Sequence, residues 1–285
     1  MRKLYADSHC HSNPVKGMGA DKISKLFKKH GGWFIALVSL PPYHYGLSEP
    51  LIDNYRKLVE IMLLEKKIVI ENSLSTSLFI GFHPAEIDEY YRRGISLEKI
   101  LELAEKVLDL LVEYYRNGLI NGIGEVGRQH YSTSPARQVL AELILLKTLE
   151  YSRDYDIPLH LHLEQSGLIT IKSINYYIEK LNVPRRNILI HHVNYDTGYW
   201  SEKYNLWHSI PAKERDIEKN IVEKREYILI ESDYIDDPKR PGVSSYPWDI
   251  AINLEKFIER NIVDQNTVDK IMIDNIVKFY RVNPP

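Results

Sequence analysis

The chain has 285 residues, of which 44% are hydrophobic and 27% charged, the balance of a globular protein with a sizeable core. Lys and Arg total 37 against 39 Asp and Glu, so the net charge of −2 excludes an overall basic field that would draw the chain to nucleic acid. The single cysteine, Cys10, excludes an internal disulfide and a cysteine-rich zinc site.

Membrane and export signals are not visible in the sequence. No apolar run approaches the ~20 residues of a membrane-spanning helix. The start, MRKLYADSHCHSN, lacks the apolar stretch of a signal peptide. We therefore predict a cytoplasmic protein.

Short apolar runs alternate along the chain with longer stretches of 3.6-residue periodicity. The strand-like runs are 3–9, 33–40, 77–83, 119–127, 157–164, 186–193 and 225–233. The clearest helix-like runs are 95–118, 134–155, 168–181, 248–261 and 265–282. Ser96 is the expected N-cap and Gly118 the expected C-cap of the first of these helices.

This alternation predicts parallel strands joined by helical crossovers. An eighth strand is expected within 198–207, which would close a TIM (β/α)8 barrel with a distortion around strand 7. No repeat or linker divides the chain, so residues 1–285 are expected to form a single domain. An open doubly wound sheet is the competing architecture.

The histidines gather at the ends of the strand-like runs, where a barrel builds its active site. Seven of the 11 lie there: His9, His11, His83, His160, His162, His191 and His192. The carboxylates Asp7, Glu125 and Asp233 lie at the same kind of position. Imidazole and carboxylate are the usual ligands of zinc and related divalent ions, so this pattern predicts a metal site.

Two ligand candidates stand out among the early strands. His9 and His11 are two residues apart on a strand, so both point to one face and can share a metal. Glu125 ends an apolar strand, where an ionised carboxylate needs a cation, and its two oxygens can bridge two metals. The plainer interpretations are two surface histidines, and a Glu125 paired with the neighbouring Arg128.

The later strands offer more candidates than one site needs. His162 is expected at the level of the metal, and His160, one layer deeper, as a hydrogen-bonded core histidine. His191 and His192 are adjacent, so only one is expected to look into the barrel. Asp233 follows its strand, where it can ligate a metal and accept a proton from water, or simply cap a turn.

Five motifs together resemble the TatD-related metal-dependent hydrolases of the amidohydrolase superfamily. In chain order they are Asp7-Ser8-His9-Cys10-His11, Gly81-Phe82-His83-Pro84, Gly124-Glu125-Val126-Gly127, Pro158 with His162, and Glu231-Ser232-Asp233. IGEVGRQHY and ESDYIDDPKRPG are closest to the archaeal branch. The resemblance runs from about residue 3 to about residue 280.

The resemblance implies a TIM barrel that holds one or two divalent ions, zinc, magnesium or manganese. The metal ligands that it implies are His9, His11, Glu125, His162, His192 and Asp233. His192 is preferred to His191 because the archaeal branch has a polar residue just before this ligand. Glu125 is the implied bridge and Asp233 the implied proton acceptor, while His83 is a substrate contact.

The predicted chemistry is hydrolysis by a metal-activated water, most simply of a phosphodiester such as a DNA end. Arg128 and His130, just past a strand end, can join His83 in holding an anionic group. A small cyclic ester or amide is the alternative substrate, and a non-catalytic metal-binding barrel the alternative of another class. No membrane partner is expected, and the oligomeric state stays open.

The segment after His192 departs from the family pattern. Its tyrosines and tryptophans, Tyr195, Tyr199, Trp200, Tyr204 and Trp207, suggest a remodelled loop over the site. An aromatic rim of this kind favours the small cyclic substrate, although stacking on single-stranded bases is a second explanation. After Asp233, the segment PGVSSYPWDI is not the Gly-Pro-rich continuation expected of the archaeal branch.

Overall fold

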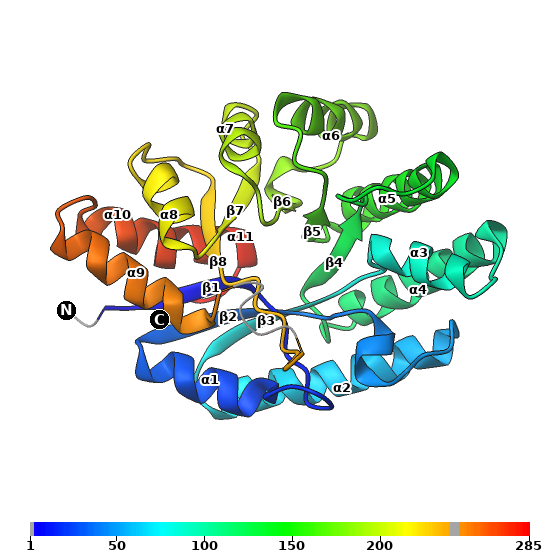
Figure 1. The fold of residues 1–285 in the computed structure, drawn as a ribbon, viewed down its shortest axis with the longest axis horizontal. Helices are drawn as coiled ribbons and strands as arrows, with labels where there is room; N and C mark the ends of the chain where they lie inside the picture. The colour runs from blue at the N-terminus through cyan, green and yellow to red at the C-terminus, as the bar shows by residue number, and fades with distance from the viewer. Residues whose placement is uncertain (1–2, 240–244) are drawn as a thin grey trace.

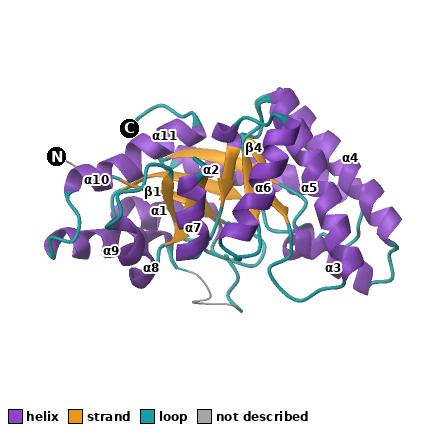
Figure 2. Cartoon of the chain, turned by 90° about the horizontal axis from the view of Figure 1, so that it is seen from above, coloured by secondary structure: helices purple, strands orange, loops and turns teal. Residues whose placement is uncertain are grey.

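The structure is a computed structural model that describes residues 3–239 and 245–285, so the end of the predicted motif at 231–242 lies outside the described residues. Eight parallel strands form one sheet in sequential order, with helices packed around its outside (Figures 1 and 2). The strands are β1 (Tyr5–Cys10), β2 (Gly32–Val38), β3 (Ser75–Ile80), β4 (Gly122–Gly127), β5 (Leu159–His162), β6 (Ile188–Ile190), β7 (Trp207–Pro211) and β8 (Ile228–Glu231). The predicted TIM barrel is confirmed, and the open doubly wound sheet is wrong.

The barrel closes incompletely between its last strand and its first. The described join consists of one isolated bridge, between Cys10 of β1 and Tyr234 just after β8, and of a hydrogen bond from the Asp233 amide to the His9 carbonyl at 3.0 Å. Side chains complete the join, because Ser8 Oγ donates to the Ile230 carbonyl at 2.8 Å. The incomplete seam therefore lies between β8 and β1, whereas β7 pairs with both of its neighbours.

The helices cover the outer face of the sheet. They are α1 (Gly19–Lys29), α2 (Ile52–Glu71), α3 (Pro84–Arg92), α4 (Leu97–Arg116), α5 (Pro135–Tyr155), α6 (Leu168–Leu181), α7 (Tyr195–Lys203), α8 (Glu214–Ile221), α9 (Pro247–Glu259), α10 (Gln265–Asp269) and α11 (Asn275–Tyr280). A π-helical turn, Lys270–Asp274, joins the last two into one run. No helix in the described part of the chain is both long and apolar enough to cross a bilayer.

The predicted caps of α4 were half right. Ser96 is the N-cap, and its side chain accepts a hydrogen bond from the Lys99 amide. The C-cap is Asn117, and Gly118 follows it with φ +72°, the left-handed conformation that glycine adopts most easily. Five helices, α1, α2, α3, α7 and α8, lie outside the predicted helical runs.

The prediction for the segment 195–207 is wrong in two respects. Tyr195–Lys203 forms α7, whose N-cap Asn194 accepts from the Thr197 amide at 2.8 Å. The strand that the sequence pattern placed within 198–207 is β7, which begins only at Trp207 and ends at Pro211. The segment does not form a loop over the site, and its aromatic side chains are absent from the described pocket lining. Instead, Trp207 is buried at the N-terminal end of β7 against Phe279.

Two apolar layers stabilise the fold. The larger one lies between the sheet and the helices. The smaller one, which we call the aromatic plug, fills the barrel interior and its N-terminal end. Its largest members are Trp33, Phe34, Phe79, Trp207, Phe279 and Tyr280. The C-terminal run seals this end, because Trp33 Nε1 donates to the Met272 carbonyl at 2.9 Å.

Candidate metal centre and active site

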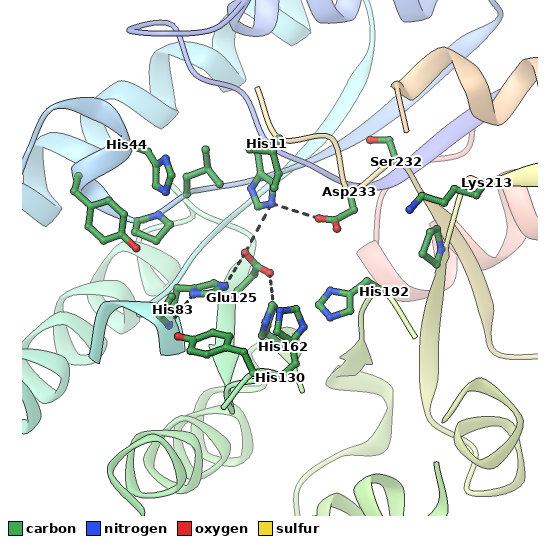
Figure 3. Close-up of a pocket in the computed structure, with 17 residues that line it drawn as sticks. His11, His44, His83, Glu125, His130, His162, His192, Lys213, Ser232 and Asp233 are labelled. Carbon is green, nitrogen blue, oxygen red and sulfur yellow. Dashed lines mark hydrogen bonds and ion pairs between the residues drawn. The ribbon is translucent and has the colours of Figure 1, made fainter. Parts of the chain in front are cut away.

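A pocket of about 550 Å³ opens at the C-terminal ends of the strands (Figure 3). Its polar lining comes from seven of the eight strand ends and from one loop segment beyond β2. These polar residues are His11, Tyr43, His44, His83, Glu125, His130, Tyr131, His162, His192, Lys213, Ser232 and Asp233. The predicted gathering of histidines at one face is therefore confirmed.

The two histidines of β1 both turn into the site, and their ring centroids lie 4.9 Å apart. His11 Nδ1 lies 2.8 Å from the Val38 carbonyl, which fixes the proton on Nδ1 and leaves the Nε2 lone pair free. That Nε2 lies 3.8 Å from Glu125 Oε2 and 3.7 Å from Asp233 Oδ1. His9 Nε2 lies 3.9 Å from Glu125 Oε1. Both free nitrogens thus face the same carboxylate.

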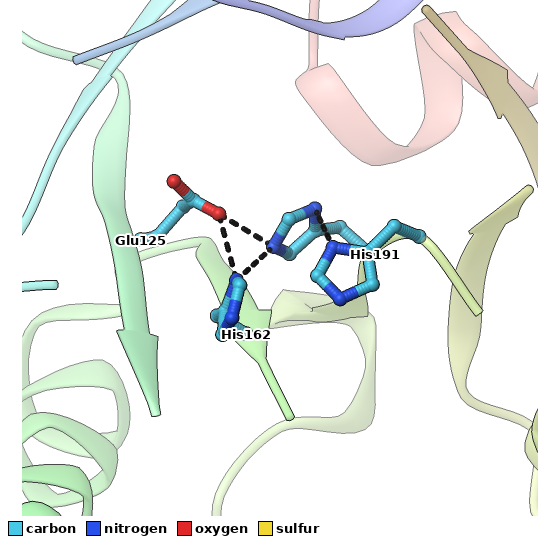
Figure 4. Close-up of side chains that lie close together, drawn as sticks. Glu125, His162 and His191 are labelled. Atoms are coloured by element: carbon cyan, nitrogen blue, oxygen red, sulfur yellow. Dashed lines mark hydrogen bonds and ion pairs between the residues drawn. The ribbon is translucent and has the colours of Figure 1, made fainter. Parts of the chain in front are cut away.

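Glu125 is the centre of the cluster and is only 4% exposed (Figure 4). Its Oε1 lies 3.0 Å from His162 Nδ1 and 2.7 Å from His191 Nε2. Burial disfavours the carboxylate, but the surrounding imidazoles hold the pKa of Glu125 well below its usual range. Gly81 lets β3 come this close, since a Cβ there would lie 2.2 Å from the Glu125 carbonyl oxygen.

Both of the adjacent histidines after β6 face the site. The strand ends at Ile190, and His192 has φ +44°, so the alternation that governs a strand no longer applies. His191 contacts Glu125, while His192 lines the pocket. The expectation that only one of them looks into the barrel is wrong. Burial opposes a charge on His191, yet Glu125 and Glu231 raise its pKa to about 10.

Asp233 and Glu231 differ in depth, as the strand pattern predicts. Asp233 lines the pocket with a side chain 25% exposed, and His11 helps to hold its pKa below the usual value although burial raises it. Glu231 is fully buried, and it accepts from the His192 amide at 2.6 Å and from Ser209 Oγ. Glu231 therefore orients the turn that carries the two histidines.

The chemistry of these donors fits divalent ions. Three imidazole nitrogens, Nε2 of His9, His162 and His192, are buried without a hydrogen-bond partner among the described residues. An orphaned buried nitrogen is costly unless its lone pair meets a cation. Donor atoms within 4.8 Å of one another form three groups: Glu125, His162, His191 and His192; His9, His11 and Glu125; and His9, His191 and Glu231.

The predicted substrate contacts separate into two kinds. His83 and His130 line the pocket, and His83 Nε2 lies 3.7 Å from Glu125 Oε2. Arg128 does not line the pocket, because its guanidinium makes two 2.8 Å bonds to Glu164 and a longer one to Glu142. Arg128 therefore lies outside the described pocket lining, bonded to carboxylates, and not beside His83 and His130 as expected.

Five polar pocket residues were not predicted as site residues: Tyr43, His44, Tyr131, Lys213 and Ser232. Lys213 follows β7, whose position the sequence pattern misplaced. His44 lies on a short 3₁₀ turn, Pro42–Tyr45, beyond β2. Burial and the nearby His11 lower its pKa to about 4, so its neutral imidazole faces the pocket. The one sequence signal for such residues is that a polar side chain lies within a few positions of a strand end.

A parallel barrel with a histidine and carboxylate cluster at the C-terminal ends of its strands defines a metal-dependent hydrolase. The chain belongs to the TatD related DNase family, whose model matches residues 6–281. The uncharacterized protein MJ1127 of Methanocaldococcus jannaschii is 28% identical over 281 residues, which cover 96% of this chain and 94% of that protein.

Solved structures share the fold over nearly the whole chain. The TatD-like protein AF1765 of Archaeoglobus fulgidus has a TM-score of 0.64 and 21% identity, covering 98% of this chain and 100% of that one. The TatD homolog YJJV of Escherichia coli has a TM-score of 0.67 and 16% identity, covering 99% and 100%. A mutant PTE-like lactonase of Deinococcus radiodurans has a TM-score of 0.61 and 9% identity, covering 98% and 96%.

Proposed function

We propose that this chain hydrolyses a nucleic-acid phosphodiester, as a TatD-like deoxyribonuclease, with one or two divalent ions held in its pocket. The observation that carries the proposal is that two donor groups share Glu125, one with His9 and His11 and the other with His162, His191 and His192. A carboxylate with two oxygens can serve both groups at once. These two groups of residues would hold the ions, with Glu125 as a ligand available to both groups.

The residues have separate tasks in this proposal. Bound divalent ions lower the pKa of water and polarise a phosphoryl oxygen. The Asp233 carboxylate accepts the proton of the attacking water at an Oδ, because it faces the pocket beside His11. Asp233 is also within reach of the donor group around His11, so it can contribute a ligand oxygen.

The pocket rim supports an anionic substrate. Lys213 is the only Lys or Arg among the described lining residues, and none of the described ion pairs includes it. Together with His130 and His83 it can donate hydrogen bonds to phosphate oxygens. Tyr43 and Tyr131 line the same pocket and offer apolar ring surface to a sugar or base.

A small cyclic ester or amide is the competing substrate class. The aromatic segment that favoured it, 195–207, contributes nothing to the described pocket lining. A basic rim favours the phosphodiester, and Lys213 supplies the one such charge. We therefore rank the phosphodiester first and make the cyclic ester an outcome of the assay.

The test joins metal analysis to turnover. Protein purified without chelator is analysed for zinc, manganese and magnesium per chain, and then assayed on end-labelled DNA oligonucleotides and on a neutral lactone. We expect close to two ions per chain and release of nucleotides from the DNA end. Asp233→Asn should lose turnover. Retained metal in this variant indicates a proton acceptor, and loss of one ion indicates a ligand.

Two results would contradict the proposal. Turnover of the lactone alone would assign the chain to small cyclic substrates. Bound metal without turnover on either substrate would leave a non-catalytic metal-binding barrel. A single bound ion with full turnover on DNA would keep the proposed hydrolysis and exclude only the shared role of Glu125.

A further inference from the structure

A chain of buried side chains connects the pocket with the C-terminal helix. His9 Nδ1 lies 3.0 Å from His160 Nδ1, and His160 Nε2 lies 3.2 Å from Tyr280 Oη. Tyr280 Oη in turn donates to the Ser8 carbonyl. His9 and His160 are fully buried and Tyr280 is 4% exposed, so water does not replace these contacts. The chain spans the barrel interior from β1 through β5 to α11.

The last member of this hydrogen-bonded series, Tyr280, determines which atom donates and which accepts at each contact. Tyr280 uses its one hydrogen on the Ser8 carbonyl, which can only accept, so its oxygen must accept from His160 Nε2. A neutral His160 with its proton on Nε2 then presents a lone pair at Nδ1. His9 must donate its Nδ1 proton to that lone pair, which leaves the Nε2 lone pair of His9 free.

Among the described residues, His160 is the one hydrogen-bond partner of a His9 ring nitrogen. The tautomer of His11 is set by the Val38 carbonyl, which no side-chain substitution removes. His9 depends instead on His160, whose ring packs on Phe79 with centroids 4.1 Å apart. If His160 carried its proton on Nδ1, His9 would have to accept there and would carry its own proton on Nε2. That nitrogen could not then bind a cation.

We propose that Tyr280 is a positioning residue that sets the tautomer of the metal-ligand candidate His9 through His160. The inference rests on the proposed function, because it takes His9 as a ligand. It extends the metal site by two residues that are 120 positions apart in the sequence and that do not line the pocket. The C-terminal helix thereby supports the metal site as well as closing the barrel.

Four variants separate this role from ordinary packing. Tyr280→Phe removes the oxygen that accepts from His160 and keeps the ring. The hydrogen-bonded series from Tyr280 through His160 to His9 is called the relay below. His160→Leu removes the relay, while His160→Gln offers an oxygen to His9 and an amide hydrogen to Tyr280. Tyr5→Phe is the matched control, because it removes a tyrosine hydroxyl from the strand that carries His9, where it bonds only Glu255 in the described structure.

The first measurement is the affinity for Co²⁺, titrated by its visible absorption against a competing chelator. Outer-shell partners of a metal-bound histidine contribute about 10- to 100-fold in affinity. We expect Tyr280→Phe and His160→Leu to weaken one Co²⁺ site by about that factor and to change its absorption band. His160→Gln and Tyr5→Phe should stay close to the parent. Equal affinity in Tyr280→Phe and the parent would overturn the proposal.

The second measurement needs no metal. Long-range ¹H–¹⁵N spectra of histidine-labelled, metal-free protein report which ring nitrogen carries the proton, with His9 assigned from His9→Gln. The parent should show His9 protonated on Nδ1, and Tyr280→Phe should lose that preference. If the parent binds no Co²⁺, the proposed function fails, and these spectra alone decide the relay. If Tyr280→Phe does not fold, the comparison of His160→Leu with His160→Gln decides it.

Discussion

The two ends of the barrel carry opposite kinds of side chain. At the C-terminal ends of the strands, His11, Glu125, His162 and Asp233 surround an open pocket. At the N-terminal ends, the aromatic plug around Trp33, Phe34 and Phe279 fills the interior with rings. One end concentrates titratable groups that cost free energy to bury, and the other concentrates apolar area that stabilises the fold.

Because the two ends differ in this way, substitutions at one end should affect the chemistry and substitutions at the other should affect the stability. A change in the polar cluster should alter metal binding and turnover while the fold persists, because the aromatic plug is untouched. A change in the plug should lower the free energy of unfolding while the pocket keeps its geometry. The relay from Tyr280 to His9 is the point where the two ends are connected.

The largest expected effect is that of Glu125→Gln. The amide keeps the size of the side chain but loses the charge that both donor groups share, so we expect turnover to fall about 1,000-fold or more. The number of metal ions per chain, measured by elemental analysis, should fall with it. Circular dichroism should show an intact fold. Full metal content in the variant would show that Glu125 is not a shared ligand.

The converse change is Trp207→Ala in the aromatic plug. Trp207 is 6% exposed and contacts Phe279 and Tyr227, so its truncation leaves a cavity and should cost about 3–5 kcal/mol of unfolding free energy. Urea unfolding of the parent and the variant measures this loss. The turnover per folded molecule should stay close to that of the parent. If turnover falls by more than the fraction of unfolded protein accounts for, the aromatic plug also affects the chemistry, and the two ends are not independent.

The sequence predicted the fold and most of the polar cluster because both follow from local patterns. Apolar runs that end in histidine or carboxylate locate strand ends, and parallel strands bring those ends to one face. His160 was correctly predicted as a hydrogen-bonded core histidine from its spacing to His162. Its actual partners, His9 and Tyr280, lie on other elements, so no local pattern could name them.

The failures have equally physical reasons. His191 and His192 follow the last residue of β6, and a left-handed backbone at His192 turns both toward the site. The side-chain alternation of a strand could not predict this geometry. Arg128 is near the site in sequence, but two glutamates from β5–α6 and α5 hold it away. β7 reads WHSIP, with two polar residues at its centre instead of an apolar run, and the aromatic residues before it belong to a helix.

A smaller effect is expected at the carboxyl group beneath the pocket rim. Glu86 is fully buried and bonds the His83 amide and two tyrosine hydroxyls, and its burial raises its pKa to about 7. The folded state therefore binds this proton more tightly than the unfolded state, whose pKa is near 4.5. The stabilisation is complete below pH 4.5 and is lost as the pH rises through 7, on the order of 3 kcal/mol.

Glu86→Gln tests this sign directly, because the amide does not titrate. Unfolding free energies of the parent and the variant are measured in urea at pH 5 and pH 8. The parent should lose more stability than the variant over this interval. A parent that gains stability relative to Glu86→Gln would show that the three hydrogen bonds lower the carboxyl pKa and outweigh burial.

The smallest effect tests the substrate and belongs to Lys213. Its ammonium group is exposed at the rim and is the one Lys or Arg among the described lining residues, so it can attract a phosphodiester without touching the metal cluster. Lys213→Ala should raise KM for a DNA substrate about 10-fold at low salt, with little change in kcat, and 0.5 M salt should erase most of the difference.

Lys213→Arg should retain the parent KM, and Lys239→Ala offers a matched exposed control. The same substitution should leave KM for a neutral lactone unchanged. An equal rise in KM for both substrates would mean that Lys213 shapes the pocket and does not recognise charge, and the preference for a phosphodiester would then lose its main support.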